Sequence, residues 1–309
     1  MTGVVLRRLA IGVFVLWGAG TMMFALLRLA PGDPATLLLG PDASPADVAA
    51  LSERLGLDRP IVVQYLTFLK DAARLDFGDS FRFGQPAMDV VLGRLQATVE
   101  LTLTATVIAV VVGLALGMLA GRRPDGPVDR VVSGLTILLQ GMPTFWVGIM
   151  LVLLFTATLG LLPSSGTGTP AHIVLPAVTL SLPFTAIVAR ITRTSVVASM
   201  REPYVRTARS KGLTESQILT GHALRNSLVP VVTIVGLQMG ALLGGAVVVE
   251  NVFAWPGLGS LVVESVSNRD YAVVQAAALL IAAIIVVLNL VADLSYSLLD
   301  PRVRTGAHR

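Results

Sequence analysis

Long runs without charged residues alternate with short polar segments along this chain. Six runs are near the length that an α-helix needs to cross the hydrocarbon core of a bilayer, which is ~20 mostly apolar residues. They cover residues 9–27, 101–121, 131–162, 173–189, 227–249 and 271–292. The pattern predicts an all-α membrane protein with six transmembrane helices.

Two of these runs contain signals that modify the prediction. The third run is longer than one span requires, and Gly141-Met-Pro143 predicts a kink within it because proline removes a backbone donor. The fourth run is expected to continue as helix to about Ala198, with Arg190 and Arg193 near its inner end. The first run is too long for the ~7–15-residue core of a signal peptide, so a retained helix is expected.

The composition agrees with a membrane protein. Hydrophobic residues make up 54% of the chain and charged residues 14%, whereas soluble domains have roughly 25% charged residues. The net charge is +4, and the basic residues fall in short loops. They are therefore interpreted as topology signals and not as a nucleic-acid surface. The chain has no Cys, so a disulfide framework and a thiolate metal site are excluded.

The loops differ in basic residues, which predicts the orientation in the membrane. The loops after the second and fourth runs and the C-terminus are rich in them: Arg122, Arg123, Arg130, Arg201, Arg206, Arg209, Lys211, Arg225, Arg302, Arg304 and Arg309. The loop of residues 163–172 on the opposite side has neither Arg nor Lys. Both termini are therefore expected in the cytoplasm.

One outer segment, residues 30–98, is long enough to form structure of its own. Ser44-Pro45 is a good helix start, apolar residues follow at helical spacing, and Gly56 can end this helix. A second short amphipathic helix is expected around Ile61 to Leu69. The segment is expected to be either a lid packed on the spans and outer headgroups or a docking surface for an external protein.

Residues that carry chemistry are scarce. The chain has no phosphate-binding loop motif, and its three His residues have no metal-ligand spacing, so neither enzyme activity nor a metal site is expected. Glu100 and Glu250 are placed at outer ends of spans and Asp293 near an inner end. The lack of mid-membrane carboxylates argues against a proton-driven carrier. A sodium-coupled carrier using backbone ligands, and a membrane anchor for an enzyme complex, stay open as alternatives.

A basic, polar segment of residues 201–230 lies between the fourth and fifth spans. Its stretch from Tyr204 to Lys211 is too polar for lipid, and Gly212 can end one short helix and turn the chain into another. The spacing fits a helix that lies in the cleft of a partner protein. It fits an ordinary cytoplasmic loop equally well.

The same segment resembles the coupling loop of permease subunits of the ATP-binding-cassette importers. Two stretches are similar to the sequence of that loop in peptide importers: Tyr204-Val-Arg-Thr-Ala-Arg-Ser-Lys-Gly212 and His222-Ala-Leu-Arg-Asn226. Further similarities to the B-type subunit of dipeptide/oligopeptide permeases extend along the chain, in Leu29-Ala-Pro-Gly-Asp-Pro34, Arg54-Leu-Gly-Leu-Asp58, Gly78-Asp-Ser-Phe81, Glu250-Asn-Val-Phe253, Pro256-Gly-Leu-Gly259 and Asp300-Pro-Arg302. The resemblance implies the type I importer permease fold with an outer helical insertion after the first helix.

The resemblance also implies roles for particular residues. The ATPase-coupling residues would be Tyr204, Arg206, Thr207, Ala208, Arg209, Lys211, Gly212 and His222. Phe253, Trp255, Pro256 and Gly257 would reach towards a binding protein, although a plain turn is an equal alternative. The implied domains are residues 1–29 (first helix), 30–98 (outer insertion), 99–300 (core, with the coupling loop at 199–226) and 301–309 (tail).

The mechanism that the resemblance implies is ATP-driven import by alternating access. The partners would be a second similar permease, two ATPase subunits that hold ATP and Mg²⁺, and an extracytoplasmic solute-binding protein, with no cofactor in this chain. Related permeases carry dipeptides, longer peptides, glutathione, nickel chelates or haem, so peptide is the expected but not the only possible substrate.

The translocation path is predicted from buried polar groups and helix breaks. Gln140, Met142 and Pro143 in the third span and Gln238 and Gly244 in the fifth are the expected lining. An unpaired amide is costly in lipid, which favours the glutamines facing a path. The glycines of the fifth span can equally serve close helix packing.

Overall fold

The computed structural model describes residues 2–29, 36, 44–54 and 56–299, and this part of the chain is built from helices. The chain divides into two compact units. One unit contains residues 1–96 and 257–287, and the other contains residues 97–256 and 288–309. Two long helices, α5 (Ala87–Arg122) and α13 (Tyr271–Leu299), contribute residues to both units.

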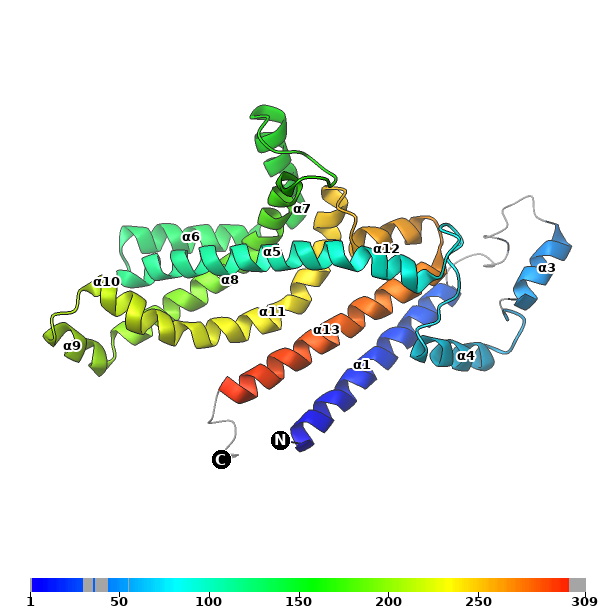
Figure 1. Ribbon diagram of the computed structural model, residues 1–309, viewed down its shortest axis with the longest axis horizontal. Coiled ribbons are helices and arrows are strands. Elements are labelled where there is room, and N and C mark those ends of the chain that lie inside the picture. Colours follow the sequence, from blue (N-terminus) through cyan, green and yellow to red (C-terminus); the bar gives the residue numbers. More distant parts are fainter. Residues whose placement is uncertain (1, 30–35, 37–43, 55, 300–309) are drawn as a thin grey trace. The chain divides into compact units, whose positions relative to one another are not determined.

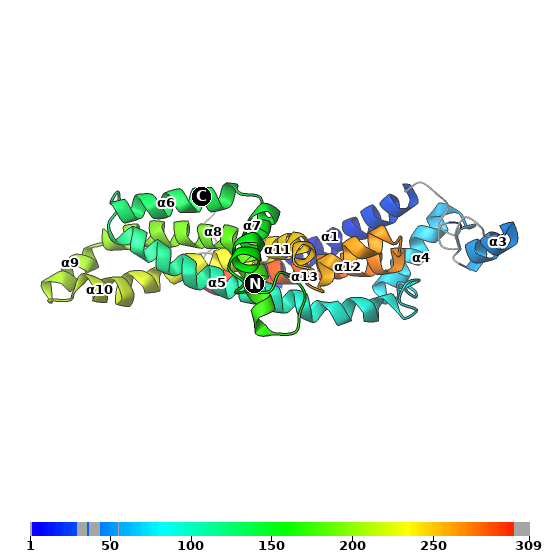
Figure 2. The same cartoon turned by 90° about the horizontal axis from the view of Figure 1, so that it is seen from above.

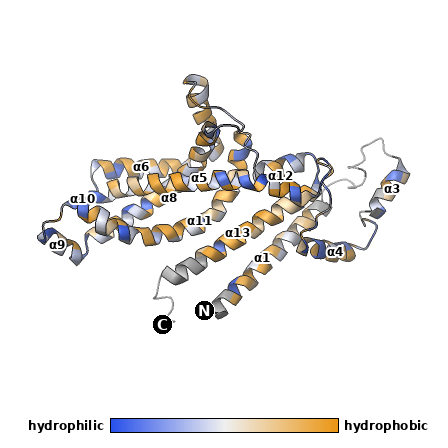
Figure 3. Cartoon of the chain, in the orientation of Figure 1, coloured by the Kyte–Doolittle hydropathy of each residue, from blue (hydrophilic) through white to orange (hydrophobic). Residues whose placement is uncertain are grey.

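Among the described residues, five helices are long and apolar enough to span a membrane, and six if a bent pair counts as one span. The five are Leu6–Leu26, Ala87–Arg122, Pro170–Met200, Ser227–Val252 and Tyr271–Ala292. Apolar residues predominate along these helices, whereas α3 (Pro45–Arg54), α9 (Pro203–Ser210) and α10 (Glu215–Ile218) are largely polar (Figure 3). The all-α membrane fold predicted from the hydrophobic runs is confirmed.

The third predicted span is the bent pair, and its bend is larger than a kink. Helix α6 (Pro127–Gly141) ends before Met142, and α7 (Thr144–Leu151) begins after Pro143. Met142 and Pro143 have extended backbones, with ψ of 133° and 129°. Two extended residues in sequence reorient the chain, so the helices meet at 106°. A π-helical turn, η1 (Val152–Thr158), continues α7.

In the first unit, helices α1 (Thr2–Leu29) and α13 run side by side (Figure 1). They approach closely because α1 presents Gly12 at the contact, where a Cβ would lie only 2.7 Å from Cγ1 of Val286. Helix α4 (Ile61–Ala73), from the segment that the sequence predicts to be outer, packs on the end of α1. Its Tyr65 hydroxyl lies 2.7 Å from the Thr21 hydroxyl, and the rings of Tyr65 and Phe24 meet edge to face.

The other outer helix, α3 (Pro45–Arg54), begins where the sequence predicts. The Ser44 hydroxyl accepts a hydrogen bond from the backbone N–H of Asp47 at 3.2 Å, which satisfies one of the free donors at a helix start. Gly56 follows with a φ of +64°, a left-handed conformation that suits glycine. These two helices lie within residues 30–98, the segment that the sequence predicts to be an outer insertion.

The loop expected between the last two spans contains an additional helix, α12 (Leu258–Ser267). Its Leu258 and Leu261 are buried against the start of α5 and the start of α13. The segment before α5 is bound to the same region by polar contacts. The Ser80 hydroxyl donates to Asp270 at 2.5 Å, and Arg82 forms an ion pair with Glu264 of α12. These contacts agree with a lid packed on the spans.

The second unit is a helix bundle in which α5, α6, α8 (Val174–Met200) and α11 (Leu224–Val252) lie together (Figures 1 and 2). Its core includes Leu101, Leu175, Phe184, Val188, Val231, Val249 and Phe253. Helices α5 and α8 approach closely because Gly117 faces α8, where a Cβ would lie 2.5 Å from the Ala189 carbonyl oxygen. The short helices α9 and α10 lie at one end of this bundle (Figure 1).

Candidate functional site

The segment between α8 and α11 forms two short helices separated by a tight turn. Helix α9 (Pro203–Ser210) begins with proline at its first position, where the missing N–H is not needed. Gly212 then turns the chain with a φ of +81°. Helix α10 (Glu215–Ile218) begins with a capping box, in which the Thr214 N–H donates to the Gln217 side chain at 2.9 Å. The predicted helix and left-handed turn are therefore confirmed.

An apolar base fixes the two short helices to each other and to α8. Val205 and Ala208 of α9 and Ile218 of α10 are buried together, and Met200 at the end of α8 packs on them. Val205 and Ile218 were not among the predicted site residues, although the spacing of Val205 and Ala208 by three residues is typical of one helix face. Because this apolar base includes Met200, α9 is packed on the end of α8 and is not a free loop.

Most of the predicted coupling residues lie on the opposite, exposed side of this element. Tyr204, Arg206, Thr207, Arg209, Lys211 and Gly212 are exposed. Ala208 is the exception, since it belongs to the buried base. His222 lies in the π-helical turn η3 (Leu219–Ala223), and its side chain lies outside the described part of the structure.

An ion pair joins α9 to α10 across the Gly212 turn. The Arg209 Nε donates to Oε1 of Glu215 at 2.7 Å, and both side chains are nearly half exposed. The hydrogen bond from Arg209 lowers the pKa of Glu215, and the same contact raises the pKa of Arg209. Because the pKa of Glu215 is lowered, the stabilisation that the ion pair gives is present above the ordinary pKa of glutamate. It is lost as the pH falls through the lowered pKa. The pair is therefore intact at neutral pH.

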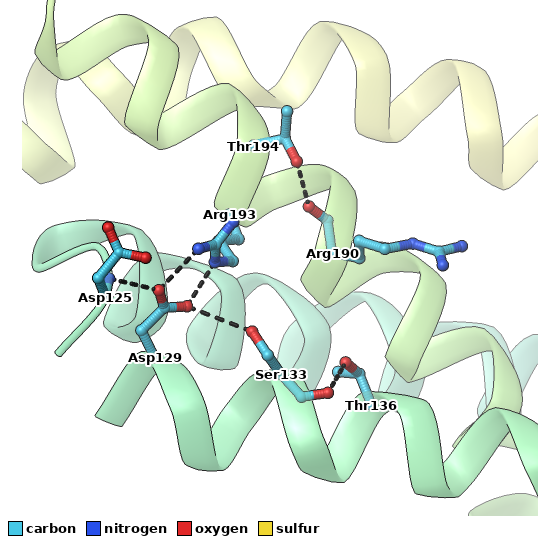
Figure 4. Close-up of polar contacts among 7 residues, drawn as sticks. All are labelled: Asp125, Asp129, Ser133, Thr136, Arg190, Arg193 and Thr194. Carbon is cyan, nitrogen blue, oxygen red and sulfur yellow. Dashed lines mark hydrogen bonds and ion pairs between the residues drawn. The ribbon is translucent and has the colours of Figure 1, made fainter. Parts of the chain in front are cut away.

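A further ion pair, which sequence reasoning missed, joins α6 to α8 ten residues before the start of α9 (Figure 4). Arg193 donates through both Nε and Nη2 to the carboxylate of Asp129, with 2.6 Å between Nη2 and Oδ2. Asp129 also accepts from the backbone N–H of Asp125 and from the Ser133 hydroxyl. Asp129 is only 3% exposed. A carboxylate this buried requires such partners, because an unpaired buried charge is costly.

The α8 helix is thus held on two sides near its C-terminal end. On one side, the glycine face of α5 allows contact with the backbone of α8; at Gly121, a Cβ would lie 2.8 Å from Cβ of Val196. On another side, Asp129 of α6 binds Arg193. The C-terminal part of α8 is therefore attached to both α5 and α6.

The predicted path residues lie on two helices of this bundle. Gln140 is exposed at the end of α6, and Met142 and Pro143 form the break to α7. Gln238 on α11 is half-buried, and Gly244 is exposed, with no atom within 4 Å of the position that a Cβ would occupy there. No hydrogen bond joins Gln140 to Gln238 in the described part of the chain, so their shared role stays a prediction.

The predicted docking residues are mostly in the core. Phe253 and Trp255 are 1% and 5% exposed, and the Trp255 Nε1 donates to the Ala97 carbonyl at 2.9 Å. Gly257 is also buried and Pro256 is half-buried. The two aromatic side chains are held in the bundle core, so in this conformation they cannot contact a binding protein directly. Ala254 between them is exposed and has a left-handed φ of 48°.

Comparisons with known families agree with this arrangement. Residues 113–305 match the family described as "Binding-protein-dependent transport system inner membrane component". Residues 1–102 match the family described as "Binding-prot-dependent transport system membrane comp, N-term". The two matches together cover nearly the whole chain, including helices α3, α4, α9 and α10.

Individual relatives match over almost their full length. The probable peptide ABC transporter permease protein y4tP of Sinorhizobium fredii is 39% identical, over 97% of this chain and 98% of the relative. The dipeptide transport system permease protein DppB of Alkalihalophilus pseudofirmus is 36% identical, over 98% of this chain and 100% of the relative. The glutathione transport system permease protein GsiC of Escherichia coli K12 is 40% identical, over 98% and 99%.

Solved structures share the fold at lower identity. A chain of the MetNI methionine ABC transporter in an inward-facing conformation aligns with a TM-score of 0.53 and 19% identity, covering 69% of this chain and 97% of that chain. An amino acid ABC transporter aligns with a TM-score of 0.51 and 22% identity, covering 69% and 94%. The helical bundle is the type I ABC importer permease fold. These matches show that the chain belongs to the family of binding-protein-dependent transport system inner membrane components, the ABC transporter permeases.

Proposed function

We propose that this chain is one of two permease subunits of an ATP-driven importer that moves di- and oligopeptides across the cytoplasmic membrane by alternating access. A solute-binding protein delivers the peptide from outside. Two ATPase subunits bind ATP and Mg²⁺ and drive the change of conformation. Both termini and the α9–α10 element lie in the cytoplasm.

The observation that carries this proposal is the construction of the α9–α10 element. It presents exposed polar and basic side chains on an apolar base that is continuous with α8. A partner that displaces α9 therefore displaces α8 as well, because Val205 and Met200 pack together. Such an element suits a chain that receives mechanical work from separate subunits.

The peptide substrate is supported by the relatives. The relatives described above are named as permeases for peptides, dipeptides or glutathione, and glutathione is itself a tripeptide. Glutathione is therefore the second candidate. Nickel chelates and haem remain alternatives carried by the family resemblance alone.

Reconstitution tests the proposal. The chain is placed in liposomes with a second permease, two ATPase subunits and a binding protein from the same gene neighbourhood. Uptake of labelled dipeptides, longer peptides and glutathione is then measured. We expect uptake that requires both ATP and the binding protein, and that stops when the phosphate-loop lysine of the ATPase is replaced.

The same experiment separates the rival class of transporter. Uptake that follows an imposed sodium or proton gradient and is indifferent to ATP would contradict the proposal and identify a secondary carrier. ATP-dependent uptake of glutathione without any uptake of other peptides would assign the second candidate.

A further inference from the structure

Helix α8 carries two arginines, three residues apart, in very different surroundings. Arg193 is bound by Asp129, whereas the side chain of Arg190 extends away from that pair (Figure 4). Arg190 is exposed, and within the described part of the chain its guanidinium forms no ion pair. It lies ten residues before the end of α8 at Met200, which is about 15 Å along the helix axis. Arg190 is therefore a charged group inside a candidate span.

The exposed stripe around Arg190 is unlike the lipid-facing surfaces of this chain. Arg190, Thr194 and Ala198 follow each other at intervals of four residues and are all exposed, so they form one face of α8. Many exposed positions of other spans carry large apolar side chains, such as Val13 on α1 and Ile137 on α6, which are 67% and 74% exposed. A stripe of one cation, one hydroxyl and one small residue fits water better than lipid.

The other faces of α8 have partners within the bundle. Gly117 of α5 contacts the backbone at Ala189, Asp129 of α6 binds Arg193, and Gly245 of α11 lies against Leu180. Charged residues within membrane helices are expensive in lipid and almost always face the protein interior or a water-filled cavity. The proposed path lies between two permease chains, so a path-lining residue is exposed when one chain is considered by itself.

We propose that Arg190 lines the inner part of the translocation path and contacts the carboxylate of the peptide in transit. The proposal rests on the function proposed above and adds a chemical preference to it. A guanidinium can donate two parallel hydrogen bonds to a carboxylate, a geometry that an ammonium or an amide cannot match. Arg190 is exposed, so the attraction is screened by water and the contact is transient.

The test compares a peptide that has a free carboxylate with its C-terminal amide in the complete reconstituted importer. Arg190→Gln is expected to slow uptake of the free acid by about two- to fivefold, the range of an exposed ion pair, and to leave uptake of the amide unchanged. Arg190→Lys is expected to recover part of the loss. The matched control is Arg123→Gln, which removes an exposed arginine from the loop after α5 and is expected to behave like the unaltered chain. Affinities of the binding protein for both peptides are measured to correct for delivery.

Equal slowing of the two peptides by Arg190→Gln, or no slowing of either, would overturn the proposal. If the unaltered importer takes up neither peptide, the proposed function fails, and the peptide assignment of Arg190 fails with it. These outcomes differ, because the unaltered complex reports on the function and only the ratio between the peptides reports on Arg190.

Labelling distinguishes the path from the lipid headgroups, which offer phosphate to the same guanidinium. The chain has no native Cys, so the cysteine introduced by Arg190→Cys is its only thiol. This thiol is probed in nanodiscs with a charged, water-soluble reagent. Modification that excess peptide slows would support the proposal. Modification only by a lipid-soluble reagent, together with an effect of Arg190→Gln that depends on anionic lipid, would place Arg190 at the headgroups and reject it.

Discussion

Gly212 makes the turn between α9 and α10. Its φ of +81° lies in the left-handed region, and no atom lies within 4 Å of the position that a Cβ would take. A side chain at this position would therefore meet no steric obstacle from neighbours, and the only penalty would come from the backbone conformation. The penalty for a left-handed L-residue is roughly 1–2 kcal/mol, and it is smaller for Asn, whose side chain can bond locally.

We predict that Gly212→Val uncouples the importer. The β-branched side chain disfavours the turn between α9 and α10, so α9 no longer holds its orientation. ATPase activity should stop responding to substrate while the complex still assembles, as measured by co-purification and by hydrolysis with and without loaded binding protein. Gly212→Asn is the control and should stay close to normal. Normal transport by Gly212→Val would refute the importance of this turn.

At the scale of elements, the ion pair between Asp129 and Arg193 attaches α6 to α8. Asp129 is almost fully buried, whereas the Arg193 side chain is 31% exposed. Removing Arg193 and removing Asp129 should therefore have different effects on the partner that is left. An uncompensated Asp129 stays in the bundle, but an uncompensated Arg193 can turn towards water.

We predict that Arg193→Gln destabilises the chain more than Asp129→Asn. Breaking a buried ion pair leaves an unpaired charge and costs about 3–5 kcal/mol of unfolding free energy. The cost of Asp129→Asn should lie below that range, because the Arg193 that it leaves unpaired is partly exposed. Thermal unfolding in lipid nanodiscs measures the order. The double variant Asp129→Leu with Arg193→Met serves as the control, since replacing both charges by apolar side chains is often neutral. An equal loss in the two single variants would show that the burial of Asp129 is not decisive.

For the whole molecule, the number of crossings depends on the bent pair α6 and α7. Six crossings place both termini on one side, whereas a re-entrant pair leaves five crossings and places the termini on opposite sides. The 106° bend at Met142 and Pro143 is compatible with either a broken span or a re-entrant loop by geometry alone. The basic residues before α6 and the loop of residues 163–172 without them favour a crossing.

Labelling from one side of the membrane decides between five and six crossings. Single cysteines are introduced at Arg123, Ser165 and Ser210, which are exposed positions, and the chain has no other Cys. We predict that an impermeant reagent applied from outside modifies Ser165→Cys and spares Arg123→Cys and Ser210→Cys until the membrane is opened. Modification of both Arg123→Cys and Ser165→Cys, or of neither, from the same side would show that the pair does not cross.

Several features followed from the sequence because they depend on neighbouring residues only. The length of an apolar run is a local property, and the last candidate span, Tyr271–Ala292, has the predicted bounds. Helix starts and turns are also local, as at Ser44 and Gly212. The family motifs belong to this class as well, since each is a short stretch of sequence. The predicted coupling residues fall in the segment that forms α9, α10 and the turn between them.

Other features were decided only by tertiary packing. Asp129 and Arg193 are 64 positions apart, and their contact depends on how α6 crosses α8. The burial of Trp255 depends on the Ala97 carbonyl that accepts its N–H, and the helix of residues 258–267 depends on its contacts with α5 and α13. The size of the α6–α7 bend depends on two ψ angles that Pro143 permits but does not dictate. Hydropathy and turn propensity act within one segment, whereas pairing and burial are set by which segments meet.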